Sequence, residues 1–364
     1  MNRFLYYLII INMIANIVAS VPRILLAEST NGAITSMILG TFAGLFITIV
    51  TIKFYAAYPK TDLMELLNTH TRKWFSILAL LYFAINWYIA GLITLITFTF
   101  ILIRFLTPEM PLVVILFSLL VVILGGILIK TKSILFMFEV VIVLFCPLII
   151  FLLVKTGFNN VFVIDYVRIA MMHINEMPSY SALTATSYLY IGIVNLAVFN
   201  KFFSHKKKIT FLPIFILTIV GVVVLGLTYF APIGVGGFDE IERLIYPWIS
   251  TSDSIRMKFG LVERLLFIFL LVFLAIAIMS IIIHWHGASK LLQGAFSRKW
   301  FNWKGHDLSP FLYIILFSLI ALIAMINLTE HQLFKLTQFF FNLLPSFFGI
   351  SMFVFFTINR RAKR

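Results

Sequence analysis

The sequence predicts an all-α polytopic membrane protein with ten transmembrane helices. Hydrophobic residues make up 62% of the 364 positions and charged residues only 12%, whereas about a quarter of the residues of a soluble domain are charged. The hydrophobic residues form runs of roughly 20, the length that a helix needs to cross a bilayer. These runs lack the two-residue alternation of barrel strands, so a closed barrel is not expected. Helices are then the structure that satisfies the backbone hydrogen-bonding groups within the lipid.

We expect one membrane domain over residues 1–364, without a soluble domain. The polar stretches near 155–177, 231–260 and 285–308 are read as loops, and the run at 74–103 is long enough to tilt. The predicted spans are 4–26, 33–54, 74–103, 111–129, 134–154, 178–200, 210–230, 261–284, 309–328 and 336–358.

The basic residues fix the predicted orientation. Of the 28 Lys and Arg residues, 19 fall at the N-terminus, in every second loop and in the C-terminal tail, including Lys206–Lys208 and Arg360–Arg361. Cytoplasmic loops are enriched in Lys and Arg, so both termini are expected to be cytoplasmic. This topology and anionic lipid headgroups account for the net charge of +14 without a nucleic-acid partner.

The N-terminal hydrophobic run is expected to be an uncleaved span, because it is too long for a signal peptide and no small-residue cleavage site follows it. The single cysteine, Cys146, lies within a predicted span, so no internal disulfide is expected.

Two predicted spans contain features that interrupt helices. The first carries Asn12 and Asn16 and then Pro22, which removes a backbone donor. Pro22 either opens the helix toward the bundle interior or simply ends it. The sixth span carries Gly192 and Asn195 at its middle, which suits either local unwinding or ordinary close packing.

These interruptions fall in spans 1 and 6 of ten, so each opens one five-helix half, over 1–154 and 178–358. Five is odd, so the second half is inverted relative to the first. Inverted halves with broken helices are typical of transporters that bind a substrate near the midplane.

The sequence also resembles the endospore germination permease family, the permease-like B subunits of spore germinant receptors. The similarity covers essentially the whole chain. The segments that carry it are Val21-Pro22-Arg23, Tyr58-Pro59, Leu63-Met64-Glu65, the Gly192 region with Lys206–Lys208, the block from Leu244 to Ser250, Val262-Glu263-Arg264-Leu265, and Arg360-Arg361.

This resemblance implies membership of the amino acid–polyamine–organocation superfamily and a leucine-transporter-type fold. Spans 1 and 6 would be broken around a central site, with spans 3 and 8 lining it. It further implies a role in sensing a small nutrient germinant, such as an amino acid, in the spore inner membrane, together with A-type and C-type receptor subunits.

The sequence departs from the family pattern at two places. Relatives usually carry a Gly-x-Gly-like element where this chain has Ala15-Asn16-Ile17-Val18-Ala19, and an acidic residue after the sixth-span glycine is replaced by Ile193-Val194-Asn195. Bulkier residues crowd the backbone and weaken the case for binding a bare amino-acid carboxylate.

Polar groups within spans are the candidate ligand-binding residues, since such groups are costly in a bilayer. Ser280 and His284 share a helix face at a spacing of four. His284 faces a ligand or, with Trp285 and His286, marks the inner interface. The predicted binding set is Ala15, Asn16, Ala19, Ser20, Asn86, Ile191, Gly192, Asn195, Ser280 and His284.

Glu139 in the fifth span is either a proton-relay carboxylate or a side chain that reaches the inner interface near Lys130 and Lys132. No zinc spacing, nucleotide-binding loop or catalytic elbow is present, so we expect no metal, cofactor or enzymatic activity.

The leading hypothesis is a germinant-receptor subunit. The alternatives are a free-standing proton-coupled amino acid or amine transporter and a membrane scaffold that binds no ligand.

Overall fold

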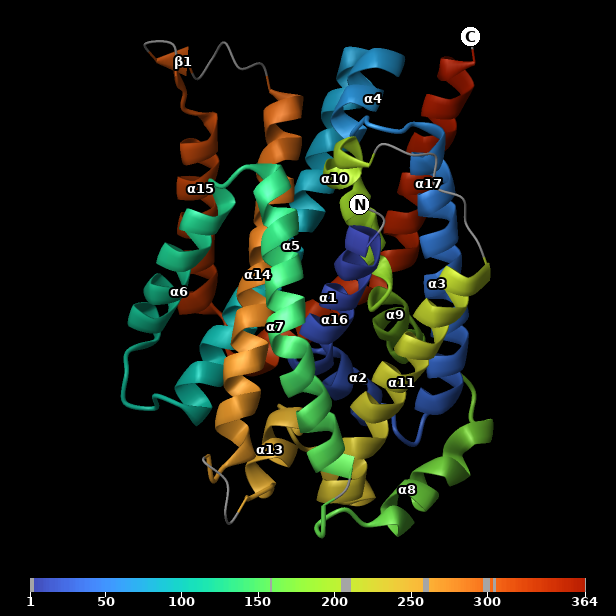
Figure 1. Cartoon of the computed structure of the whole chain (residues 1–364), viewed down its shortest axis with the longest axis vertical. Coiled ribbons are helices and arrows are strands. Elements are labelled where there is room, and N and C mark those ends of the chain that lie inside the picture. The colour runs from blue at the N-terminus through green and yellow to red at the C-terminus, as the bar shows by residue number, and fades with distance from the viewer. Residues whose placement is uncertain are drawn as a thin grey trace.

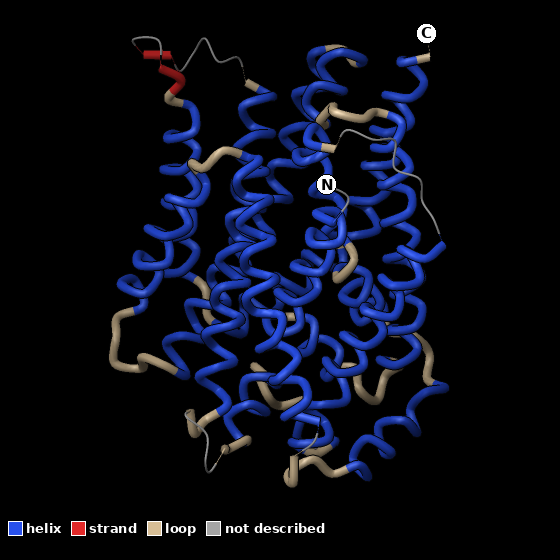
Figure 2. Tube along the Cα trace, viewed as in Figure 1, coloured by secondary structure: helices blue, strands red, loops and turns tan. Residues whose placement is uncertain are grey.

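The structure is a computed structural model that describes residues 3–157, 159–203, 211–257, 262–296, 302–303 and 306–363. It is a bundle of helices (Figures 1 and 2). Within the described residues the only two strands, β1 (Asn302–Trp303) and β2 (His306–Asp307), form a two-residue antiparallel hairpin. The predicted all-α membrane class is therefore confirmed.

The α-helices run from near the N-terminus to the C-terminal tail, with three short 3₁₀ segments among them. They are α1 (Arg3–Ala19), α2 (Val21–Ala27), α3 (Ala33–Ala57), α4 (Leu63–His70), α5 (Lys73–Phe105), α6 (Leu112–Ile127), α7 (Thr131–Gly157), α8 (Ile164–Met171), η1 (Met172–Asn175), α9 (Tyr180–Tyr188), η2 (Ile191–Asn195), α10 (Leu196–Phe199), η3 (Asn200–Phe202), α11 (Phe211–Gly236), α12 (Phe238–Ile241), α13 (Pro247–Ser254), α14 (Leu265–Ala295), α15 (Ser309–Asn327), α16 (Glu330–Asn342) and α17 (Leu344–Ala362).

Seven of the described helices are long and apolar enough to cross a membrane, and two bent helix pairs raise that number to nine if each pair is one span. The sequence-based count of ten also includes α6, which has only 16 residues. The described helices therefore confirm a protein that spans the membrane several times.

The first predicted span is bent. Its two parts, Arg3–Val18 and Val21–Ala27, meet at an angle of 54°. Ser20 occupies the N-cap position of α2, and Pro22 lies in the first turn of that helix, where its missing N–H group has no intrahelical partner to lose. Pro22 therefore starts a second helix in a new direction.

The sixth predicted span is bent as well, by 49° between Tyr180–Tyr188 and Ile191–Phe202. The second part alternates short 3₁₀ and α-helical turns. A Cβ atom added at Gly192 would collide with the carbonyl oxygen of Leu8 and lie 2.7 Å from the Cβ of Asn12. Glycine at this position thus allows the break to pack directly against α1.

Two long helices, α5 and α14, pack side by side in the centre of the bundle (Figure 1). An added Cβ at Gly91 would lie 2.5 Å from the Trp285 indole, and one at Gly287 would lie 2.7 Å from the Trp87 indole. Each helix thus accepts an indole of the other over a glycine. We call this arrangement the indole–glycine interlock.

The loops gather at the two ends of the bundle. In Figure 1, α4, β1 and the C-terminus lie at the upper end, while α8 and α13 lie at the lower end. The upper elements belong to the segments that the sequence predicts to be cytoplasmic. The Lys206–Lys208 run lies outside the described residues.

Two predicted spans have different boundaries in the structure. The eighth was expected to end at 284, but α14 continues to Ala295, and Trp285 and His286 are buried inside the bundle. The tenth was expected over 336–358 and is part of one longer apolar span, Glu330–Ala362, in which a turn at Leu343 separates α16 from α17. Polar residues were read as loop in the first case, and the turn near Pro345 was missed in the second.

Candidate ligand-binding site

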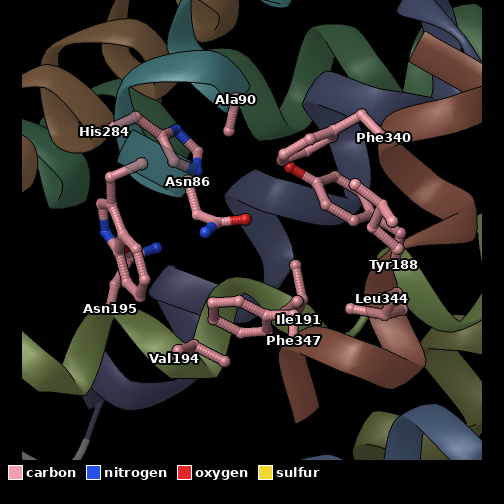
Figure 3. A pocket seen from close by; sticks show the side chains of 12 residues that line it. Asn86, Ala90, Tyr188, Ile191, Val194, Asn195, His284, Phe340, Leu344 and Phe347 are labelled. Carbon is pink, nitrogen blue, oxygen red and sulfur yellow. The ribbon is translucent and has the colours of Figure 1, made fainter. Parts of the chain in front are cut away.

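A cavity of about 40 Å³ lies near the middle of α5, beside the break in the sixth span. A water molecule needs about 10–15 Å³ of such space, so the cavity has room for about three waters. The lining residues are Asn86, Trp87 and Ala90 of α5, Tyr188 of α9, Ile191, Val194 and Asn195 of η2, His284 of α14, Phe340 of α16, Leu343, and Leu344 and Phe347 of α17 (Figure 3).

The structure brings together four of the ten predicted site residues at this cavity: Asn86, Ile191, Asn195 and His284. Ala15, Asn16, Ser20, Gly192 and Ser280 do not line it, and the side chain of Ala19 lies outside the described part of the chain. The cavity is enclosed by the predicted spans 3, 6, 8 and 10. Span 10 thus takes the place that the sequence-based prediction gave to span 1.

Asn195 holds the wall of the cavity in place. Its Oδ1 accepts a hydrogen bond of 2.8 Å from the indole Nε1 of Trp87, and its Nδ2 donates to the carbonyl of Gly192 over 3.1 Å. Both ends of this buried amide are therefore used within the protein. The role of Asn195 in the described geometry is to fix Trp87 against the broken span.

His284 presents a hydrogen-bond acceptor to the cavity. Its Nδ1 lies 2.7 Å from the carbonyl oxygen of Ser280 and 3.4 Å from the Ser280 hydroxyl. A carbonyl only accepts, so Nδ1 carries the proton and Nε2 is left as an acceptor in the neutral ring. His284 is 8% exposed and lines the cavity, so its ring lies within the bundle. Ser280 orients the ring without reaching the cavity.

Asn86 and Tyr188 contribute the other polar groups. The Asn86 Nδ2 donates to the carbonyl of Tyr82 over 2.8 Å, which leaves Oδ1 as an acceptor. In Figure 3 the side chains of Asn86, His284 and Tyr188 turn toward the same open space. None of the described lining residues is Asp, Glu, Lys or Arg. No described lining residue is thus charged, and these three polar groups stand beside Asn195 and Trp87 among aromatic and aliphatic walls.

The first span forms hydrogen bonds with the break in the sixth span, next to the cavity. The Asn12 Nδ2 donates to the carbonyl oxygens of Tyr188 and Leu189, over 2.8 and 3.0 Å. Asn16 in turn donates to the backbone carbonyl of Asn12 over 2.8 Å. The asparagines that the sequence singled out in span 1 therefore bond to the break in the sixth span, Asn12 directly and Asn16 through Asn12. Ser20 is buried at the bend of the first span.

A group of hydrogen bonds joins α16 to the first half of the broken span. Thr184 donates to Asn342 Oδ1 over 2.8 Å, Gln338 donates to the Ser181 hydroxyl over 2.9 Å, and Tyr180 donates to the Asn342 carbonyl over 2.7 Å. We call these five residues the α9–α16 clasp. Because Tyr188 and Phe340 line the cavity from α9 and α16, the clasp joins the two helices that form that side of it.

The inner end of the broken span is held to the predicted inner loop. Asn200 donates to the carbonyls of Tyr58 and Thr61, each over 2.8 Å. Lys201 pairs with Asp62 over 3.3 Å, and Asp62 caps α4. The broken span is thus anchored at both ends of the bundle, with the cavity between the anchors.

Comparison with known proteins places this architecture in a family. The chain matches the family model Spore_permease, described as spore germination protein, over residues 2–359. The chain belongs to this spore germination protein family. A search of the curated proteins gives no match.

Sequence reasoning missed most of the apolar wall in this spore germination protein. The missed lining residues are Trp87, Ala90, Tyr188, Val194, Phe340, Leu343, Leu344 and Phe347. Aromatic residues are so frequent here, with 40 Phe alone, that composition does not distinguish a cavity wall from ordinary packing. The polar residues Gln338 and Asn342 were the available signal that span 10 faces the interior.

Glu139 lies away from the cavity and pairs with Arg3 over 2.9 Å. The Arg3 side chain is 58% exposed, so this contact fits the interfacial alternative for Glu139. In the described parts of this family member, no group of three or more His, Cys, Asp or Glu residues is arranged to hold a metal ion.

Proposed function

We propose that the chain is the permease-like, ligand-binding subunit of a spore germinant receptor. A small nutrient germinant, such as an amino acid or similar molecule, binds in the cavity between α5, η2, α14 and the α16–α17 pair. The observation that carries this proposal is the convergence of Asn86, Tyr188 and His284 on one cavity at a helix break. An apolar pocket with a few convergent polar groups is the usual form of a small-molecule site.

The proposal includes a ten-span, leucine-transporter-type arrangement of two inverted five-helix halves, with both termini cytoplasmic. The two bends of 54° and 49° support it, since one lies in the first span of each half. The predicted basic loops described by the structure also lie at one end of the bundle (Figure 1). The protein resides in the spore inner membrane and acts with A-type and C-type receptor subunits.

The signal arises from a shift between conformations. A ligand changes an equilibrium only if it binds one state better than another. The cavity wall includes Phe340 of α16, and the clasp ties α16 to α9. A germinant larger than the cavity of this structure therefore favours a bundle in which α16 has moved, and the partner subunits respond to that state.

Germination of spores that carry variant chains tests the proposal. Asn86→Leu removes a polar group from the cavity, whereas Asn327→Leu makes the same change at an exposed amide that bonds the carbonyl four residues earlier, as Asn86 does. We expect Asn86→Leu to abolish the nutrient response with an unchanged membrane level and Asn327→Leu to respond normally. A normal response from both variants, at normal membrane level, contradicts ligand binding at this cavity and favours the scaffold.

A second measurement separates a receptor subunit from a transporter. The purified chain is reconstituted alone in vesicles with a proton gradient, and accumulation of labelled amino acids and amines is followed. We expect no accumulation, and we expect the chain to co-purify with its A-type and C-type partners from forespores. Accumulation by the chain alone, lost in Asn86→Leu, supports the transporter instead.

A further inference from the structure

The hydrogen-bonding groups of the cavity define the chemistry of the molecule that fits it, and this inference rests on the proposed ligand-binding function. Each N–H-bearing side chain of the lining already donates within the protein. Trp87 donates to Asn195, Asn195 to Gly192, Asn86 to Tyr82, and the Nδ1 of His284 lies against the Ser280 carbonyl.

The groups that remain include both donors and acceptors, because the Asn86 and Asn195 amide nitrogens each carry a second hydrogen. The Asn86 Oδ1 and the His284 Nε2 are hydrogen-bond acceptors, and the Tyr188 hydroxyl lines the same cavity. A hydroxyl both donates and accepts. The cavity therefore offers the His284 acceptor, the Asn86 amide and the Tyr188 hydroxyl, which turn toward a common space (Figure 3).

A charged ligand group would lack a counter-charge here. None of the described lining residues carries a formal charge, and an unpaired charge is costly to bury. No described helix terminus supplies the missing counter-charge either. No described residue of α1 or α2 lines the cavity, and the carbonyls of Tyr188 and Leu189 at the end of α9 are already used by Asn12.

We propose that the cavity binds an uncharged molecule through a primary amide group. The amide nitrogen donates its two hydrogens to the Asn86 Oδ1 and the His284 Nε2, and the amide oxygen accepts from the Tyr188 hydroxyl. A carboxylate of the same shape has no hydrogen to donate to the His284 acceptor, and no described lining residue balances its charge. An ammonium group has donors, but it brings a charge that nothing in the described lining balances.

The volume of the cavity in this structure indicates the size of the amide. About 40 Å³ takes about three water molecules, which is close to the four non-hydrogen atoms of acetamide. Such small ligands bind weakly because each atom contributes a limited free energy, so we expect dissociation constants in the millimolar range. Larger amides require movement of the α16 side of the wall.

Saturation-transfer NMR on the full chain in nanodiscs provides the test, with two matched pairs of probes. Acetamide and acetate have nearly the same shape but differ in charge, and glycolamide and glycine are isomers of which only glycine is a zwitterion. We expect both amides to bind, glycolamide at least about tenfold more tightly than glycine because of the cost of burying charge. Asn86→Leu should abolish amide binding, and Asn327→Leu should preserve it.

Tyr188→Phe is a milder variant, since it removes only one hydroxyl. We expect it to weaken acetamide binding several-fold, whereas Tyr229→Phe, which changes a buried tyrosine remote from the cavity, should have no effect. Loss of binding in both tyrosine variants contradicts the assigned contact.

The outcomes separate the amide inference from the proposed function. Glycine or acetate binding as tightly as the amides, with loss in Asn86→Leu, overturns the amide chemistry and leaves the ligand-binding function standing. Absence of binding by all four probes to the folded chain overturns both.

Discussion

The side-chain amide of Asn12 donates a 2.8 Å hydrogen bond to the backbone carbonyl of Tyr188, 176 positions later in the chain. The last carbonyls of a helix lack intrahelical partners, and the same amide also reaches the carbonyl of Leu189. One side chain of the first bent span thus caps the helix end at which the second bent span changes direction. The two breaks are structurally dependent on each other.

Replacing Asn12 with Leu should destabilise the protein by about 1–3 kcal/mol, because a buried carbonyl that loses its partner keeps its desolvation cost. Asn12 is only 2% exposed, so water does not replace the amide. Thermal unfolding of the detergent-purified chain measures this effect. Asn327→Leu is the control, and equal midpoints for the two variants contradict the capping role.

Gly192→Ala should destabilise the protein by about 1–3 kcal/mol through overpacking. The new methyl group meets the carbonyl of Leu8 and the side chain of Asn12, so α1 and η2 must separate. Gly226→Ala is the matched control, because nothing lies within 4 Å of a Cβ at that position. Membrane level and unfolding midpoint are the readouts. A stable Gly192→Ala protein shows that the close approach is not required.

Trp87→Phe should reduce the nutrient response, because it deletes the indole donor and leaves the buried Asn195 Oδ1 without its partner, at a cost of about 1–3 kcal/mol. Trp74→Phe changes an exposed indole on the same helix and should leave the response normal. Germination rate against nutrient concentration is the measurement. Identical curves for both variants argue against Trp87 as a functional part of the wall.

Asn342→Leu should loosen the α9–α16 clasp, since Asn342 bonds both Thr184 and Ser181. Cys146 is the only cysteine, so Cys146→Ala with Phe340→Cys gives a single reporter on the cavity wall. We expect Asn342→Leu to speed labelling of this cysteine by a small thiol reagent.

The same reporter with Asn327→Leu should label at the unaltered rate. Unchanged labelling in the Asn342→Leu protein indicates that α16 is held in place by contacts other than the clasp.

Hydropathy predicts the membrane class and most helix boundaries well. The runs expected at 33–54, 74–103 and 309–328 correspond to Ala33–Ala57, Lys73–Phe105 and Ser309–Asn327. These boundaries follow from local composition, because each helix begins or ends where polar residues meet an apolar run. The inner end of α14 was wrong because composition does not tell a buried polar residue such as His286 from a loop residue. His286 is buried through bonds to Thr131 and the Ile127 carbonyl.

The site was predicted only in part, because its walls depend on tertiary packing. Asn86, Asn195 and His284 stood out as polar residues within apolar runs, and they line the cavity. Asn12 stood out for the same reason, yet it caps a helix end. Whether an amide faces a cavity or a carbonyl depends on which neighbour lies opposite. The contribution of Phe340 and Phe347 depends on their ring contacts with Tyr188 and Trp87, which apolar residues alone do not signal.

The indole–glycine interlock has a consequence for how this bundle moves. With Trp285 seated over Gly91 and Trp87 seated over Gly287, neither long helix slides along the other unless both rings leave their places. Shear between α5 and α14 is thereby blocked at two points that face in opposite directions. We therefore expect α5 and α14 to move least, and any displacement to occur in the bent helix pairs that pack against one side of them.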